Sequence, residues 1–391
     1  MNVNDTIATL TCNVVMLAAG LAAGMVALPA KAVQSFAATP IANTLGGTNS
    51  WGYGINASGQ VTGSADIAGD VATHAFLYFG GTMTDLGTLG GSRSAGSAIN
   101  DTGQVTGSSG LAGDVATHAF LYSGGVMTDL GTLGGRNSRA SGINANGQVT
   151  GTADVAGAQS RAFLYSDGIM TDLDTRDVSI FAGSTGAAIN ARGQVAGWSC
   201  VCGHAPTYRA SLYFHGTMTD LGTLGGANSW GYGINASGQV TGTAATVDTP
   251  GYAGHVFLYS DGTMTDLGTL GGEYAESTAI SASGQVTGWS YLADNVTQRA
   301  FLYSGGTMYD LNSLVVSGLA GVILTSATAI NDKGQIVANG CSTEGCMAYR
   351  LDPIAEPAGV TAIPTLSRGA VGVMVLLLLA SGLLLRRRPN R

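Results

Sequence analysis

The sequence has little charge and few of the side chains that most enzymes use. Only 10% of its 391 residues are Asp, Glu, Lys or Arg, and it has 5 His and 5 Cys. Residues 33–362 carry 23 acidic against 10 basic side chains, a net charge of −13. Binding to nucleic acid needs clustered cations, so we expect no nucleic-acid partner.

Arrangements typical of catalysis are also missing from the sequence. We find no paired carboxylates at a fixed spacing, no nucleophile elbow and no Gly-rich phosphate loop ahead of a helix. Asp residues do recur in loops and could offer oxygen ligands to Ca²⁺, but they form no ordered Asp-x-Asp-x-Asp run. We therefore predict a protein that is not an enzyme, with no catalytic residues, no metal and no cofactor.

Glycine is abundant, with 61 residues, and it marks a repeat. A period of 44 to 50 residues is typical of solenoids, propellers and arrays. A Gly-Gln pair recurs seven times at this period, and we number the repeats 1 to 7 by its glutamine: Gln60, Gln104, Gln148, Gln194, Gln239, Gln285 and Gln335.

Each of repeats 1 to 6 contains four short segments that alternate apolar and polar residues, as half-buried strands do. In repeat 1 the first segment ends at Ile55, and the others are Gln60–Ser64, His74–Tyr78 and a strand that begins near Met83. An Asn-x-x-Gly link predicts a three-residue hairpin in the first pair, and Gly80-Gly81 predicts a two-residue turn in the second. Four antiparallel strands are the composition of a propeller blade.

We therefore predict an all-β fold, a seven-bladed β-propeller of four-stranded antiparallel blades over residues 40–352. Repeat 7 lacks a fourth strand, because Met347–Leu351 runs into Pro353. Residues Ile41–Gly47 match the end of the fourth strand of other repeats, so we expect this N-terminal strand to pair with Met347–Leu351 and close the ring. A β-solenoid is the alternative fold, and it needs no such match between the two ends.

Both ends of the chain carry targeting features. Residues 1–32 contain an apolar stretch that stops at Ala30-Lys31-Ala32, a cleavage pattern typical of a secretory signal peptide; the alternative is a buried helix. After a linker at 353–362, residues 363–391 contain an apolar run, Ala370–Leu385, followed by Arg386–Arg388. This pattern predicts a transmembrane segment with a cytoplasmic Arg tail.

The motif Ile363-Pro364-Thr365-Leu366, together with this tail, resembles the IPTL-type C-terminal sorting signal of Gram-negative bacteria. The resemblance implies recognition by an exosortase-like processing enzyme and transient anchoring in the inner membrane. It also implies a final location that is secreted or on the cell surface. A plain membrane anchor is the alternative.

The repeats resemble HAF-type extracellular repeats over about residues 41–352. The signature stands at His74-Ala75-Phe76 and at His118-Ala119-Phe120, with near copies from Arg161 and Arg299. The resemblance implies an exported or surface-located bacterial protein and assigns no chemistry. Because the His of the signature lies diagonal to a fourth-strand Asp, as His74 does to Asp85, we interpret the two as a scaffold pair.

Cysteine usage is consistent with export. An oxidising compartment favours disulfides, and we predict a local bridge between Cys341 and Cys346. Cys200 and Cys202 share another loop, where a strained bridge and a metal site with His204 are alternatives.

Aromatic residues are the candidate binding residues. We expect them before the first strand and after the second, near variable loops that share one face, and such loops on a rigid scaffold are a common way to build a binding surface. Packing between blades is the alternative role. The sequence thus favours an exported, surface-associated, non-catalytic propeller that binds a glycan or surface protein or serves structurally; the alternative is an extracellular glycan-active enzyme. The binding hypothesis names Trp51, Tyr53, Trp198, Trp230, Tyr232, Trp289 and Tyr291.

Overall fold

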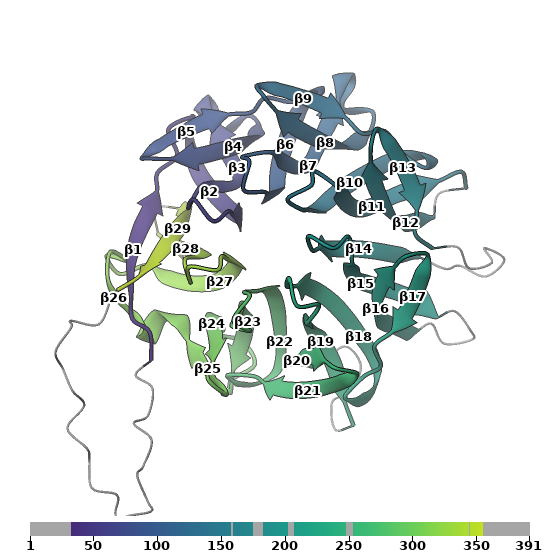
Figure 1. The fold of residues 1–391 in the computed structure, drawn as a ribbon. Coiled ribbons are helices and arrows are strands. Elements are labelled where there is room, and N and C mark those ends of the chain that lie inside the picture. Colours follow the sequence, from purple (N-terminus) through teal and green to yellow (C-terminus); the bar gives the residue numbers. More distant parts are fainter. Residues whose placement is uncertain are drawn as a thin grey trace, which may run out of the picture. The chain divides into compact units, whose positions relative to one another are not determined.

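The computed structural model describes residues 33–157, 159–174, 183–201, 207–247, 253–343 and 345–354. These residues form one compact unit, Val33–Ile354. Its secondary structure is almost entirely antiparallel β-sheet, and the sheets follow one another in chain order (Figure 1). The predicted signal peptide, the linker from Ala355 and the sorting motif at 363–366 lie outside the described residues.

Repeat 1 consists of four strands, β2 (Gly46–Ile55), β3 (Val61–Ile67), β4 (Thr73–Phe79) and β5 (Thr82–Asp85), paired antiparallel in sequence order. The predicted hairpin is present between the first two. The side-chain Oδ1 of Asn56 accepts hydrogen bonds from the backbone N–H groups of Ser58 and Gln60, and Gly59 takes a φ of +79°. Asn and Gly at these positions therefore fix the turn.

The next five repeats have the same four strands, and repeat 7 has three. Their bounds are β6 (Gly90–Ile99), β7 (Val105–Leu111), β8 (Thr117–Ser123) and β9 (Val126–Asp129); β10 (Gly134–Ile143), β11 (Val149–Val155), β12 (Ser160–Ser166) and β13 (Ile169–Asp172); β14 (Ser184–Ile189), β15 (Val195–Val201), β16 (Thr207–Phe214) and β17 (Thr217–Asp220); β18 (Gly225–Ile234), β19 (Val240–Thr246), β20 (His255–Ser260) and β21 (Thr263–Gly268); β22 (Gly271–Ile280), β23 (Val286–Leu292), β24 (Gln298–Ser304) and β25 (Thr307–Asp310); and β27 (Ile323–Ile330), β28 (Ile336–Ser342) and β29 (Gly345–Pro353).

In the described part of the chain these strands form six sheets. Repeats 3 to 6 each form a four-stranded sheet. Repeats 1 and 2 together form an eight-stranded sheet, in which a single parallel pairing between Thr73 and Arg93 joins the two repeats. The sixth sheet contains repeat 7, the N-terminal β1 (Phe36–Ile41) and the short β26 (Val315–Ser317). Two segments from opposite ends of the chain, β1 and β29, thus lie side by side (Figure 1).

The strand that pairs with β29 is not the predicted one. The pairing runs from Phe36, opposite Pro353, to Ile41, opposite Ala348. Residues 42–45 belong to no strand, because the side chain of Asn43 donates hydrogen bonds to the carbonyls of Asn49 and Asp66 and turns the chain toward β2. The motif shared with the other repeats marks the connection after the fourth strand, not the strand itself.

The core is divided into clusters between neighbouring repeats. The Phe of the third strand is fully buried in repeat 1, as Phe76, and packs against Val61 and Met83. Because Phe, Val and Ile recur at the same positions, similar clusters form in other repeats. Burying a side chain of this size stabilises the fold by about 1.5–3 kcal/mol.

Polar contacts also link each repeat to the next. The Nδ2 group of Asn56 donates to the backbone carbonyl of Asn100 in repeat 2 at 3.1 Å, and equivalent bonds occur at five other junctions. One of them joins Asn331 to Asn56 at 2.9 Å, between repeats 7 and 1. Ser281 stands where repeat 6 should have Asn. Residues from all seven repeats line a cavity of about 300 Å³ beside these bonds.

Candidate functional site

The tryptophans lie within strands, not in the loops where the sequence placed them. Trp51 and Trp230 are in the first strands β2 and β18, and Trp198 and Trp289 are in the second strands β15 and β23. Three of them face a small polar residue on the paired strand, as Trp51 faces Ser64. The innermost strands are longer than the sequence suggested, so these rings belong to the sheets.

Two of the predicted residues form one aromatic cluster across two repeats. Trp198 of repeat 4 contacts Tyr208 edge-on, with ring centroids 5.4 Å apart. Tyr208 stacks on Trp230 of repeat 5 at 5.8 Å and an interplanar angle of 27°. Both tryptophans are partly buried. Tyr208 was not predicted as a site residue, because it precedes the His-Ala-Phe position, where the repeat carries no aromatic signal.

A second cluster surrounds a carboxyl group in repeat 6. Trp289 lies 5.2 Å from Tyr274 and 5.4 Å from Tyr291 between ring centroids. The Tyr274 hydroxyl donates to Glu276 Oε2 at 2.9 Å. Glu276 occupies the strand position at which repeats 1 and 5 have tryptophan, so it is a departure from the repeat that the sequence could have revealed.

Burial governs the ionisation of this second cluster. Loss of solvent raises the pKa of the Glu276 carboxyl, and hydrogen bonds from Tyr274 and Trp289 partly oppose that rise. Burial, with the nearby charge of Glu276, also raises the pKa of Tyr274 and of Tyr232, which comes from repeat 5. Tyr232 is therefore part of the electrostatic surroundings of Glu276.

The other two predicted residues stand apart from these clusters. Tyr53 is 37% exposed, and Trp51 is partly buried. Neither makes a ring contact within the described part of the chain. The structure thus places four of the seven predicted aromatic residues in two separate ring clusters of repeats 4 to 6, with Tyr232 near the second.

The His–Asp pairs have the predicted diagonal arrangement. His74 Nδ1 lies 2.9 Å from Asp85 Oδ2, and Asp85 Oδ1 also accepts the backbone N–H of Gly87 at 2.7 Å. Equivalent contacts occur in repeats 2 and 5 with His and in repeats 3 and 6 with Arg. In repeat 4, Arg209 and Asp220 form no ion pair among the described residues. These pairs hold the turn after the fourth strand, which is a scaffold role.

Among the described residues no group of three or more His, Cys, Asp or Glu could hold a metal ion. The loop carboxylates bind the protein instead, as Asp70 does with the backbone N–H and hydroxyl of Thr48. Cys200 is buried, and Cys202 and His204 lie outside the described residues.

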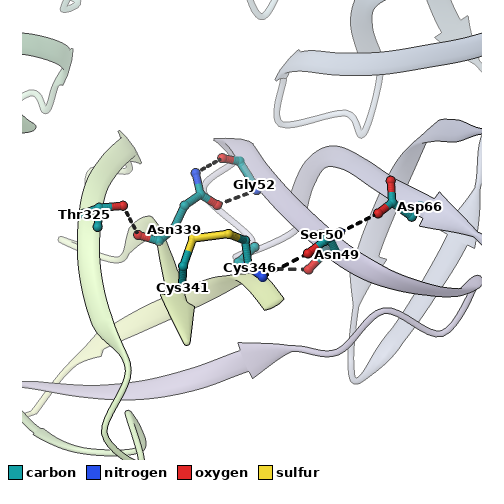
Figure 2. Close-up of a disulfide and its surroundings, with 9 residues drawn as sticks. Asn49, Ser50, Gly52, Asp66, Thr325, Asn339, Cys341 and Cys346 are labelled. Carbon is teal, nitrogen blue, oxygen red and sulfur yellow. Dashed lines mark hydrogen bonds between the residues drawn. A yellow bond between two sulfur atoms is a disulfide. The ribbon is translucent and has the colours of Figure 1, made fainter. Parts of the chain in front are cut away.

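The bridge between Cys341 and Cys346 is confirmed, and it joins facing residues of β28 and β29 (Figure 2). A search of the described residues for a helix long and apolar enough to cross a membrane finds none. The predicted span at Ala370–Leu385 lies outside those residues.

Comparison with known proteins shows the fold. The structure is similar to the β-propeller domain of the Trilobed protease from Pyrococcus furiosus, with a TM-score of 0.50 and 6% sequence identity over 78% of this chain and 98% of that one. TolB from Acinetobacter baumannii gives a TM-score of 0.40 at 11% identity, covering 76% of this chain and 64% of TolB. The sialidase of Trypanosoma rangeli gives 0.38 at 11%, covering 88% and 57%.

The chain therefore has an all-β propeller fold of four-stranded antiparallel sheets. It spans less than two thirds of the length of TolB and of the sialidase. No family model and no curated protein matches the sequence. At these identities the likeness is one of fold alone.

Proposed function

We propose that this protein is an exported, surface-associated, non-catalytic propeller that binds a glycan through aromatic residues of repeats 4 to 6. The observation that carries the proposal is the continuous contact of Trp198, Tyr208 and Trp230 across two repeats. Partly exposed rings held by rigid strands offer flat apolar surface at little cost in side-chain entropy. Such surfaces suit stacking on sugar rings.

The scaffold in this proposal is a ring of seven blades, with β1 as the fourth strand of the last. Two kinds of contact support it, because they occur both between consecutive repeats and between repeats 7 and 1. The backbone N–H of Ala75 donates to Ser94 Oγ in the next repeat at 2.8 Å, and Ala348 N–H donates to Ser50 Oγ at 3.3 Å. The second kind is the Asn side-chain bond, which Asn331 makes to repeat 1.

The proposed location follows from the two ends of the sequence. A signal peptide over residues 1–32 would direct export, and the Ile363–Leu366 motif with its tail would be processed by an exosortase-like enzyme at the inner membrane. The mature propeller would then be secreted or held at the surface of a Gram-negative bacterium. The Cys341–Cys346 disulfide supports this location, because such bridges persist in oxidising compartments.

A glycan-active enzyme is the second candidate, and one observation favours it. Glu276 is a carboxyl group whose pKa is raised by burial, surrounded by aromatic rings. Groups of this kind serve as general acids. A network of ion pairs or hydrogen bonds with a purely structural role can also shift the pKa of a carboxyl group. Tyr274 already donates one hydrogen bond to Glu276.

The test is a glycan-array screen of the full-length protein, followed by titration of the best ligand. We expect Trp230→Ala to weaken binding severalfold to about tenfold, because a stacked ring contributes on the order of 1 kcal/mol. Trp51→Ala should have a smaller effect, and Phe79→Ala, which removes an exposed ring at 55% exposure, is the matched control.

Unchanged binding by Trp230→Ala would reject the aromatic surface. If the array shows no glycan ligand, and the wild type but not Trp230→Ala captures a surface protein, the partner is a protein and not a glycan. Cleavage of the bound glycan by the wild type, lost in Glu276→Gln, would establish the enzyme instead.

A further inference from the structure

A cavity of about 600 Å³ lies where repeats 1, 2 and 3 meet. This volume is within the range of small-molecule sites. Hydroxyl groups line it, among them those of Ser64, Ser108 and Thr117, and so do two guanidinium groups, Arg93 and Arg139. None of the aromatic residues proposed above lines this cavity.

The cavity exists because repeat 2 departs from its neighbours. In repeat 1, Asn49 Nδ2 donates to Asp66 Oδ2 at 2.8 Å, and repeat 3 has the same Asn–Asp contact at 3.0 Å. At the same two positions repeat 2 has Arg93 and Gly110. The glycine removes a carboxylate, and the arginine replaces a short amide by a cation.

A second departure empties the space beside these residues. Repeats 1, 4, 5 and 6 each place a tryptophan at one of two facing positions on their first and second strands. In repeat 2 the facing residues are Ala95 and Ser108. Two small side chains cannot fill the volume that an indole ring occupies elsewhere, so the cavity stays open.

The polar groups of the cavity are available to a ligand. Arg93 and Arg139 are exposed, and neither forms an ion pair within the described ranges. In the same ranges, the hydroxyls of Ser64 and Ser108 make no hydrogen bond. The one carboxylate in the lining, Asp114, accepts the backbone N–H of Ser92 at 2.8 Å and is held at the wall.

The local charge is opposite in sign to that of the domain. Residues 33–362 carry a net charge of −13, which disfavours unspecific attraction of a polyanion. The cavity concentrates two of the 10 cations of this region. Guanidinium groups present a planar fork that matches a carboxylate and remain charged at any physiological pH.

We propose that this cavity binds an acidic sugar, with Arg93 and Arg139 holding its carboxylate and the hydroxyls of Ser64 and Ser108 contacting its hydroxyl groups. The inference rests on the proposed function only in taking the ligand to be a glycan. It names a charged class of sugar and a site on repeats 1 to 3, apart from the aromatic clusters of repeats 4 to 6.

The experiment is calorimetric titration of the full-length protein with oligogalacturonate and with its methyl ester, which has the same backbone without the charge. We expect the wild type to bind the acid and not the ester at this site. Arg93→Gln and Arg139→Gln should each weaken binding roughly tenfold, because each removes a charge-assisted hydrogen bond. Arg192→Gln, which removes an exposed cation from the hairpin of repeat 4, should change nothing.

A double variant protects the test against misfolding. Arg93→Asn with Gly110→Asp installs the Asn–Asp pair that repeats 1 and 3 already use. A Cβ at residue 110 would lie 2.7 Å from Asp114 Oδ1, so this carboxylate must shift. Repeat 1 has carboxylates at both corresponding positions, Asp66 and Asp70, so the variant should fold and lose the acid. Absence of binding by the wild type, or equal binding of acid and ester, would overturn the proposal. So would full binding by the double variant.

The outcome separates this proposal from the previous one. Trp230→Ala should leave binding of oligogalacturonate intact, because Trp230 is not in the lining. Binding of the ester that is lost in Trp230→Ala, with no preference for the acid, would support the aromatic surface and reject the acidic-sugar cavity.

Discussion

The side chain of Asn339 in repeat 7 pairs with both backbone polar groups of Gly52 in repeat 1. Gly52 N–H donates to Asn339 Oδ1 at 2.9 Å, and Asn339 Nδ2 donates to the Gly52 carbonyl at 3.1 Å (Figure 2). Residues 287 positions apart thus form an amide–amide contact of the kind that links strands. A Cβ at Gly52 would lie 2.5 Å from a methyl group of Val337, so glycine permits this close approach.

Replacing Asn339 should therefore destabilise the propeller. Asn339→Ala leaves the buried N–H of Gly52 without this partner, whereas the Gly52 carbonyl keeps the hydrogen bond from the Thr328 hydroxyl at 2.8 Å. One unsatisfied buried group costs about 1–3 kcal/mol. We expect a loss of about 1–3 kcal/mol in the free energy of unfolding, measured by urea denaturation. Asn146→Ala is the control: it removes an exposed side-chain amide that donates to the Ala191 carbonyl of the next repeat at 3.3 Å. Because this bond is exposed to water, the variant should stay within about 0.5 kcal/mol of wild type. Equal losses in both variants would contradict the role of the contact.

The N-terminal strand should contribute as much as an internal one. Phe36 is 1% exposed and packs in the core cluster of repeat 7. We expect Phe36→Ala to cost about 3–5 kcal/mol, the usual loss for a buried Phe. Phe79→Ala makes the same chemical change at a residue that is 55% exposed and should cost little. A small loss at Phe36 would mean that β1 is not an integral strand.

The disulfide should stabilise the last hairpin modestly. It closes a loop with a sequence separation of 5, and a loop this short gives about 2 kcal/mol by chain entropy. We expect Cys341→Ser with Cys346→Ser to lower the melting temperature, and a reductant to lower that of the wild type to the same value. A further effect of reductant on the double variant would show that another thiol pair contributes.

Glu276 should make stability depend on pH. Burial raises the pKa of its carboxyl in the folded protein above the ordinary value of 4.5. The contribution of Glu276 to stability is therefore fully present below the unfolded pKa and is lost as pH rises through the folded pKa. We expect Glu276→Gln to be more stable than wild type at pH 7 and to lose this advantage at pH 4. Glu273→Gln, at an exposed residue, should show no such difference. Parallel pH profiles for wild type and Glu276→Gln would reject the shift.

The sequence was sufficient for what depends on local chemistry. Asn and Gly predicted the hairpin after Ile55, and strand alternation predicted the contact of His74 with Asp85, because both follow from positions within one repeat. The bridge of Cys341 with Cys346 was likewise a local inference.

Features that depend on several repeats were missed. The N-terminal strand was placed about five residues too late, since the motif shared with other repeats is a connection that Asn43 turns. The cavity at Ala95 went unnoticed, because a small residue gives no signal until its neighbours are known. Glu276 was missed although the sequence shows it as a departure from the repeat, because its burial depends on rings from neighbouring strands.

The side-chain amide bonds between repeats occur at six junctions of the described part, including the one where the first and last repeats meet. Ser281 interrupts the series between repeats 6 and 7. There the backbone N–H of Ala282 donates to Asp332 and the hydroxyl of Thr278 to Ala327. Thermal fluctuations should consequently separate neighbouring repeats first at the junction of repeats 6 and 7, near Ser281. The place where the two termini come together should exchange its amide protons more slowly.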